Sequence, residues 1–163
     1  MKKHGIGYRR RWRKLHLAID KHTQELVFTK LSAESVSDTR FIDEIVKSSK
    51  KLKRLTMDGA ADSANIYRLL DKQGIDLLTP PQSNAVLRKE PWLKKRNERI
   101  LQILGLGGDK LARSLWAKLC GYSKRATVES AIARWKKLFG ASLQSRVAKN
   151  QDFEASIKSL IIN

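Results

Sequence analysis

The chain has 163 residues and a mass of 18.6 kDa, a length that suits one domain with a substantial hydrophobic core. Hydrophobic residues make up 41% and charged residues 31%, a composition that excludes an intrinsically disordered chain. The 34 Lys and Arg residues outnumber the 16 Asp and Glu residues, and the net charge of +18 attracts polyanions. Nucleic acid is therefore the first partner to consider.

Cysteine content and hydropathy indicate the compartment. The single cysteine, Cys120, cannot form an internal disulfide, and the Cys and His residues show no spacing typical of a zinc site. The basic start of the chain continues into arginines where a signal peptide would become apolar, and no apolar run approaches the roughly 20 residues of a membrane span. We expect a soluble, cytoplasmic protein without a membrane partner.

The chain begins with a basic segment and a predicted hairpin. Residues 2–14 carry seven Lys or Arg and no acid, which predicts a basic arm over residues 1–14, with a merely solvated leader as the alternative. Two runs rich in Leu, Ile, Val and Phe, at 12–20 and 25–32, flank a polar turn. They predict an antiparallel β-hairpin.

The rest of the chain alternates helical and strand patterns. We expect, in chain order, a helix at 38–49 capped by Asp38, a strand at 52–57, a helix from Ser63 to Gly74, a strand at 75–78, a polar loop at 82–99, a short helix at 100–104, a helix at 110–119, a helix from about 122 to 140, and a C-terminal helix within 147–163. This order predicts a mixed α/β sheet that begins with a hairpin, flanked by helices, and not a doubly wound sheet.

The predicted helix after Gly121 carries a charged face. At about 100° per residue, Arg125, Glu129 and Lys136 fall within roughly 40° of one another. The neighbouring arc is apolar, which places Glu129 at the edge of the buried face. From geometry alone, the expectation is an ordinary surface ion pair between Arg125 and Glu129.

A second acidic residue follows a predicted strand. Asp58 stands at the end of the run 52–57 and precedes Gly59, which places it at the carboxyl edge of a sheet, where ligands commonly bind in α/β folds. The alternative is a common Asp-Gly turn with no functional role.

These residues resemble a known family. Tyr122, Arg125, Glu129 and Lys136 reproduce the Tyr-x2-Arg-x3-Glu-x6-Lys signature of DDE transposases from bacterial insertion sequences. Four further blocks resemble the insertion-sequence family numbered five, so that the resemblance extends from about residue 3 to 154. These blocks are KHG at 3–5, RRRWRKLHLAID at 9–20, DGAAD at 58–62 and PPQSNA at 80–85.

The resemblance implies an RNase H-like catalytic domain in which carboxylates hold two divalent metal ions, Mg²⁺ or Mn²⁺. Asp58 and Glu129 would be catalytic, metal-binding acids. The implied partner is DNA, both transposon ends and target. The residues expected to contact its phosphates are Tyr122, Arg125 and Lys136 together with Arg9, Arg10, Arg11 and Arg13 of the basic arm.

The family pattern requires a first Asp on a strand before the hairpin, and the chain begins two residues before the KHG block. Asp20 closes the run 12–20 and does not match that position. The expectation is therefore one RNase H-like transposase domain over residues 1–163 that lacks its first strand and is inactive as this fragment. The strand at 12–20 would then have an exposed edge that favours self-association into a homo-oligomer.

Two other function classes stay open at this point. One is a non-catalytic, basic nucleic-acid-binding or regulatory protein derived from a transposase. The other is a ribosome-associated basic domain, which explains the charge but not the four-residue signature.

Overall fold

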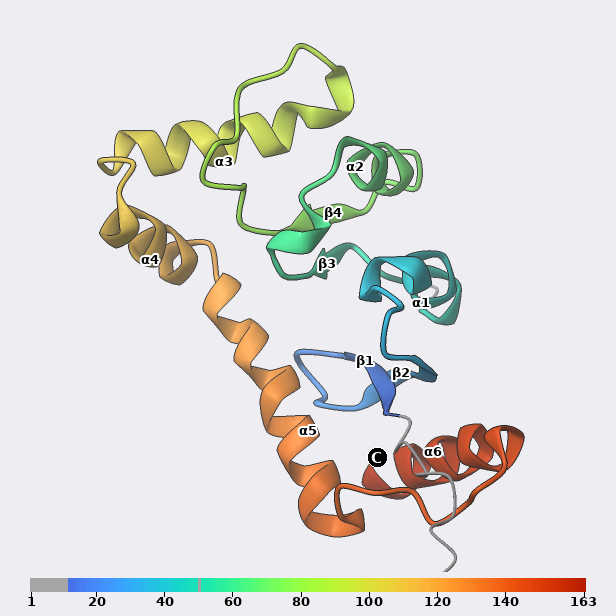
Figure 1. Cartoon of the computed structure of the whole chain (residues 1–163). Helices are drawn as coiled ribbons and strands as arrows, with labels where there is room; N and C mark the ends of the chain where they lie inside the picture. Colours follow the sequence, from blue (N-terminus) through green and yellow to red (C-terminus); the bar gives the residue numbers. More distant parts are fainter. Residues whose placement is uncertain (1–11, 50) are drawn as a thin grey trace, which may run out of the picture.

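The computed structural model describes residues 12–49 and 51–163, which form a mixed α/β arrangement (Figure 1). Arg9, Arg10 and Arg11 lie outside the described residues, as does most of the predicted arm. The described strands and α-helices, in chain order, are β1 (Arg13–Ile19), β2 (Leu26–Ala33), α1 (Ile42–Ser48), β3 (Arg54–Thr56), α2 (Ala64–Asp71), β4 (Asp76–Leu78), α3 (Lys94–Gly105), α4 (Lys110–Leu119), α5 (Ala126–Phe139) and α6 (Ala148–Ile162).

The predicted hairpin is confirmed. β1 pairs antiparallel with β2, from Arg13 opposite Ala33, and the register shifts between Ala18 and Ile19. Arg13, the last arginine of the predicted arm, therefore belongs to a strand. His16 on β1 is buried between the Asp38 carboxylate and the Ser32 hydroxyl and hydrogen-bonds both. Because Asp38 is used in this way, Ser37 and not Asp38 caps the turn that leads into α1.

A second, parallel pair of strands follows. β3 and β4 pair from Arg54 opposite Asp76 to Thr56 opposite Leu78, and α2 forms the crossover between them. The largest core cluster lies here, where Ile42 of α1, Leu70 of α2 and Leu77 of β4 are almost fully buried. Strands and helices in this region agree with the sequence pattern, although both strands are shorter than predicted.

The expectation of one mixed sheet is corrected in the described residues. The hairpin and the parallel pair are two separate two-stranded sheets, with no described strand joining them. Figure 1 shows β1 and β2 apart from β3 and β4, with the linking segment passing through α1. The alternating pattern predicts that a segment is a strand, but it does not specify which strand edges meet.

The predicted loop at 82–99 is also corrected, because α3 begins at Lys94. Pro91 starts a 3₁₀ turn that leads into the helix. The inward face of α3 includes Arg96 and Arg99, both buried, followed by Ile100 and Ile103. Two arginines at core positions hide the apolar periodicity that identifies a helix.

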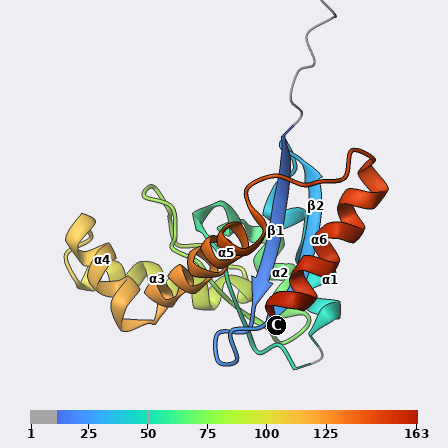
Figure 2. The same cartoon turned by 90° about the horizontal axis from the view of Figure 1, so that it is seen from below.

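The last helices enclose the hairpin. α5 lies along β1 and α6 packs against β2, as both views show (Figures 1 and 2). Trp135 of α5 and Ala155 of α6 are buried with Leu26 and Leu31 of β2 in a second core cluster. A third cluster joins α3 and α4 through Ile103 and Trp116. Across the described part, we find no helix whose length and apolar character would let it cross a membrane.

Candidate functional site

Asp58 lies two residues beyond β3, at the carboxyl end of the parallel pair. Its Oδ1 accepts a hydrogen bond from the Ala60 backbone N–H at 3.1 Å, so it caps a short 3₁₀ turn, as the Asp-Gly alternative predicts. The buried Thr79 hydroxyl, just after β4, donates to the Asp58 carbonyl and ties both strand ends together. The Asp58 side chain is still 45% exposed, so the carboxylate is open to solvent.

Arg125 joins this strand end to α5. Residues Tyr122–Arg125 form a 3₁₀ turn, and Arg125 is the residue from which α5 begins. One terminal nitrogen of its guanidinium lies 3.9 Å from Asp58 Oδ2, and the other lies 3.6 Å from Glu129 Oε1. The predicted ion pair between Arg125 and Glu129 is thus present, and the same cation also reaches Asp58.

Two carboxylates that are far apart in the sequence therefore lie around one guanidinium. Such an approach of like charges is unfavourable unless a cation compensates it. Arg125 supplies that compensation here, in long and partly exposed ion pairs that each stabilise the fold by at most about 1 kcal/mol. The sequence predicts that Glu129 lies at the edge of the buried face of the helix. Its side chain is 72% exposed, so it is more accessible to solvent than predicted. The buried residue on that turn of α5 is Ala131.

The other residues of the signature differ in accessibility. Tyr122 is half-buried beside Trp116, with ring centroids 6.1 Å apart. Burial raises the pKa of Tyr122 above its ordinary value; Arg125 opposes the shift and Asp58 adds to it, so the phenol stays protonated near neutral pH. Lys136 is exposed two helical turns beyond Glu129 on the same face of α5.

Arg13 has partners of its own within the fold. Its guanidinium donates to Asp152 Oδ1 at 3.0 Å and to Gln151 Oε1 at 3.1 Å, both on α6. The side chain is 23% exposed. Arg13 thus connects β1 to α6, and a contact between Arg13 and a DNA phosphate requires this ion pair to open.

Sequence reasoning missed the second aspartate of the DGAAD block. The Asp62 side chain is fully buried and pairs with Arg96 of α3 through two hydrogen bonds, of 2.7 and 3.2 Å. It also accepts from the Gln82 backbone N–H at 2.9 Å. Asp62 therefore fixes α3 and the segment after β4 next to Asp58. The only sequence signal for Asp62 was its place in the DGAAD block at 58–62.

The donor set at this site fits a divalent cation in kind. Carboxylate oxygens are the ligands that Mg²⁺ and Mn²⁺ prefer, and those of Asp58 and Glu129 are open to solvent. The number of acids is smaller than a two-metal centre requires. Across residues 12–49 and 51–163, no group of three or more His, Cys, Asp or Glu side chains is placed to hold a metal ion.

A family model described as "Transposase DDE domain" matches residues 1–163, which is the whole chain. No solved structure matches the chain.

Proposed function

Because the chain belongs to the family of transposase DDE domains, we propose that it is a transposase-type, DNA-binding catalytic domain of an insertion sequence of the family numbered five. The family acts in DNA cleavage and strand transfer. The observation that carries the proposal is the approach of Asp58 and Glu129 to the two terminal nitrogens of the Arg125 guanidinium. The RNase H-like architecture is part of the same proposal.

In this proposal Asp58 and Glu129 are the second and third acids of the family's triad. Their exposed oxygens would hold divalent metal ions, Mg²⁺ or Mn²⁺, which supply charge stabilisation for an in-line displacement at phosphorus. Thr79 and the turn at Gly59–Ala61 hold the Asp58 backbone in place, so its carboxylate is oriented before any ligand arrives. Arg125 offsets part of the negative charge of the pair until a ligand binds.

The remaining signature residues would contact DNA. Arg125, protonated Tyr122 and exposed Lys136 present hydrogen-bond donors and positive charge along α5, next to the acids. A phosphate near Glu129 would be met by these groups, which position the backbone without reading its sequence. The arm arginines Arg9, Arg10, Arg11 and Arg13 would extend the contact, Arg13 only after releasing Asp152.

We further propose that these 163 residues do not transfer strands by themselves. In the described part the acid pair has no third acid beside it. Asp20 does not supply one, since its carboxylate caps the hairpin turn by accepting from the His22 and Thr23 backbone N–H groups. With two acids, the reacting oxygen is held less well, and a misplacement of about 1 Å costs on the order of a hundredfold in rate.

DNA binding is tested by titrating a labelled duplex at several salt concentrations. With a net charge of +18, we expect binding dominated by phosphates, because neutralised phosphates release counterions. If about six contacts form, affinity falls roughly a thousandfold or more between about 50 and 200 mM salt. Affinity that does not change with salt would contradict the proposal.

The alternative, a non-catalytic nucleic-acid-binding protein, predicts the same salt-dependent DNA binding. It differs in predicting that Asp58 and Glu129 bind no divalent cation. In a transposase-type site, Glu129→Gln with Asp58→Asn removes divalent-cation binding measured by Mn²⁺ titration. Glu34→Gln with Glu44→Gln is the charge-matched control, because both acids are exposed and lie away from Arg125. Equal Mn²⁺ binding by the two double variants would favour the non-catalytic protein.

A further inference from the structure

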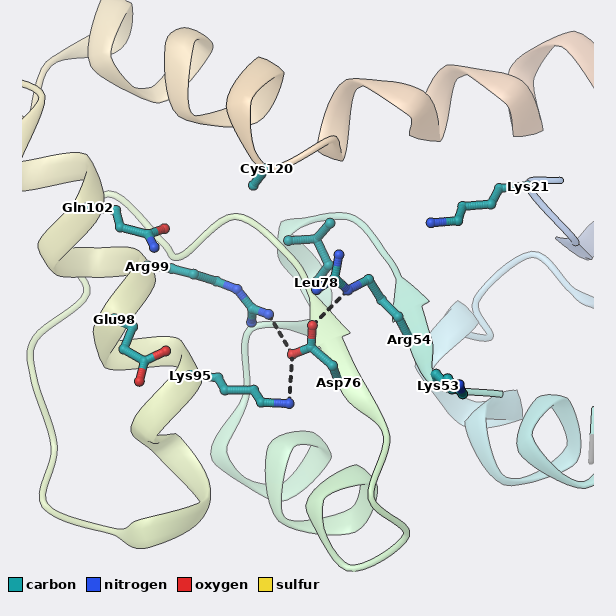
Figure 3. A pocket seen from close by; sticks show the side chains of 10 residues that line it. All are labelled: Lys21, Lys53, Arg54, Asp76, Leu78, Lys95, Glu98, Arg99, Gln102 and Cys120. Atoms are coloured by element: carbon teal, nitrogen blue, oxygen red, sulfur yellow. Dashed lines mark hydrogen bonds and ion pairs between the residues drawn. The ribbon is translucent and has the colours of Figure 1, made fainter. Parts of the chain in front are cut away.

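A basic pocket of about 510 Å³ lies on the side of β3 and β4 that faces α3 (Figure 3). Five of its lining side chains are cationic, and two are acidic. The cations are Lys21, Lys53, Arg54, Lys95 and Arg99, and the acids are Asp76 and Glu98. Residues from the hairpin turn, β3, β4 and α3 therefore converge on one positively charged hollow that the transposase signature does not include.

Asp76 organises three of these cations. Its Oδ1 lies 2.7 Å from an Arg99 nitrogen and 3.6 Å from Lys95 Nζ, while its Oδ2 accepts from Arg54 Nε at 2.8 Å. Burial alone would raise the pKa of Asp76, but Arg99, Arg54 and Lys95 outweigh it and hold this pKa below its ordinary value. Asp76 is therefore ionised, and it is surrounded by more positive charge than it can neutralise.

Two lysines supply charge that Asp76 does not use. Lys21 and Lys53 are exposed and make none of the ion pairs around Asp76. Figure 3 shows Lys21 reaching toward the pocket from the side opposite α3. Exposed ammonium groups beside an excess of fixed guanidinium charge suit an anion with several oxygens, which a phosphate group provides.

The pocket lies close to the acid pair. Arg54 is the first residue of β3, and Asp58 lies two residues beyond the end of this strand. Four residue steps of extended chain therefore separate the backbones of Arg54 and Asp58, a distance of about 13 Å. On the other side, Cys120 lines the pocket and Gly121 leads directly into the turn that carries Tyr122 and Arg125. A DNA strand that reaches Asp58 and Glu129 can therefore also reach the pocket.

We propose that this pocket binds backbone phosphates of the same DNA strand whose reacting phosphate lies at Asp58 and Glu129. This inference rests on the proposed function and adds a second anchoring site to it. In this site Lys21 and Lys53 contact the phosphates. Asp76 positions the side chains of Arg54, Lys95 and Arg99, whose combined positive charge attracts the DNA strand. The site acts on the phosphate backbone and is independent of base sequence.

The test compares charge-matched variants by fluorescence anisotropy with a labelled duplex across a salt series. Lys21→Gln with Lys53→Gln should reduce the slope of log affinity against log salt by about 2, roughly one for each lysine. Glu98→Gln, which removes an exposed acid of the same pocket, should strengthen binding. The control, Lys47→Gln with Lys72→Gln, removes the same charge from exposed positions at the ends of α1 and α2, and should keep the wild-type slope.

The outcomes separate this inference from the proposed function. If the wild-type chain binds DNA with a steep salt dependence, but the pocket and control variants lose the same amount, the pocket inference is wrong and the proposed function stands. If the wild-type chain does not bind DNA, the proposed function itself fails. Displacement of DNA by inorganic pyrophosphate at equal efficiency from wild-type and Lys21→Gln/Lys53→Gln protein would also overturn the pocket inference.

Discussion

Asp58 and Asp62 belong to one five-residue block, yet the fold gives them opposite environments. Asp58 is half exposed and has a long ion pair to Arg125 at 3.9 Å. Asp62 is fully buried and bonded to Arg96 at 2.7 Å. A buried carboxylate is tolerated only when it is paired and hydrogen-bonded, whereas an exposed one is free to take a ligand. Asp62 therefore has a structural role, and Asp58 is the candidate for chemistry.

This contrast predicts different stability effects. Asp62→Ala leaves the Arg96 guanidinium buried without its carboxylate, so we expect unfolding to become easier by about 3–5 kcal/mol. Asp58→Asn keeps a side-chain oxygen for the cap and should cost less than about 1 kcal/mol. Urea unfolding followed by circular dichroism measures both.

A second variant covers the case in which Asp62→Ala does not fold. Asp62→Asn combined with Arg96→Met removes both charges, so it should be less destabilised than Asp62→Ala alone. Equal destabilisation by Asp58→Asn and Asp62→Ala would contradict the structural role of Asp62.

Among the elements, α6 holds the loop that joins it to α5 through one carboxylate. Glu154 accepts from the backbone N–H groups of Gln144 and Ser145 at 2.9 to 3.1 Å, and Lys158 Nζ lies 2.6 Å from its Oε1. Burial would raise the pKa of Glu154, but these hydrogen bonds outweigh it and lower the pKa to about 2. The carboxylate thus fixes the loop between the two helices that cover the hairpin.

The lowered pKa predicts how stability changes with acid. Since the pKa is about 2 in the folded chain and near 4.3 when unfolded, the contribution of Glu154 is complete above about pH 5. It is lost as the pH falls from about 5 to 2. Thermal melts of Glu154→Gln between these values should show a weaker pH dependence than those of the wild-type chain.

The control for this prediction is Glu44→Gln, whose half-exposed carboxylate pairs with Lys30 at 3.4 Å. The melting temperature of Glu44→Gln should change with pH as that of the wild-type chain does, because surface ion pairs contribute little to stability. If Glu154→Gln and the wild-type chain lose stability in parallel between pH 5 and 2, then Glu154 does not have the proposed role.

For the whole molecule, the division into two small sheets leaves β1 with β2 as its only strand partner in the described part. An unpaired strand edge promotes association with another chain. The proposed function requires a further aspartate beside Asp58 and Glu129. An additional strand paired with β1 could carry this aspartate, and it would also cover the open edge of β1. We therefore expect one added strand to improve solubility and to restore activity.

The prediction is tested by fusing to the N-terminus a strand that carries one Asp. The fusion should be more soluble and should gain Mg²⁺-dependent cleavage of a transposon-end duplex, which Glu129→Gln then abolishes. The same strand with Asn in place of Asp should improve solubility only. Mg²⁺-dependent cleavage by the unextended chain, lost in Glu129→Gln, would show that a residue already present serves as the first acid.

Local pattern was enough for several features. The hairpin, the helices α1, α2, α4 and α5, and the position of Asp58 after a strand all follow from periodicity and turn residues, because these depend on neighbours within a few positions. The signature around Glu129 likewise predicted a DDE transposase domain, which the match over residues 1–163 confirms.

Only the tertiary structure decided the long-range pairs. Arg96 and Arg99 fall in the predicted polar loop at 82–99, and they became part of the buried face of α3 because Asp62 and Asp76 pair with them. The meeting of Asp58 with Arg125 has the same origin. The free energy of a buried or shared charge depends on which opposite charge lies within a few ångströms, and a one-dimensional pattern does not contain that distance.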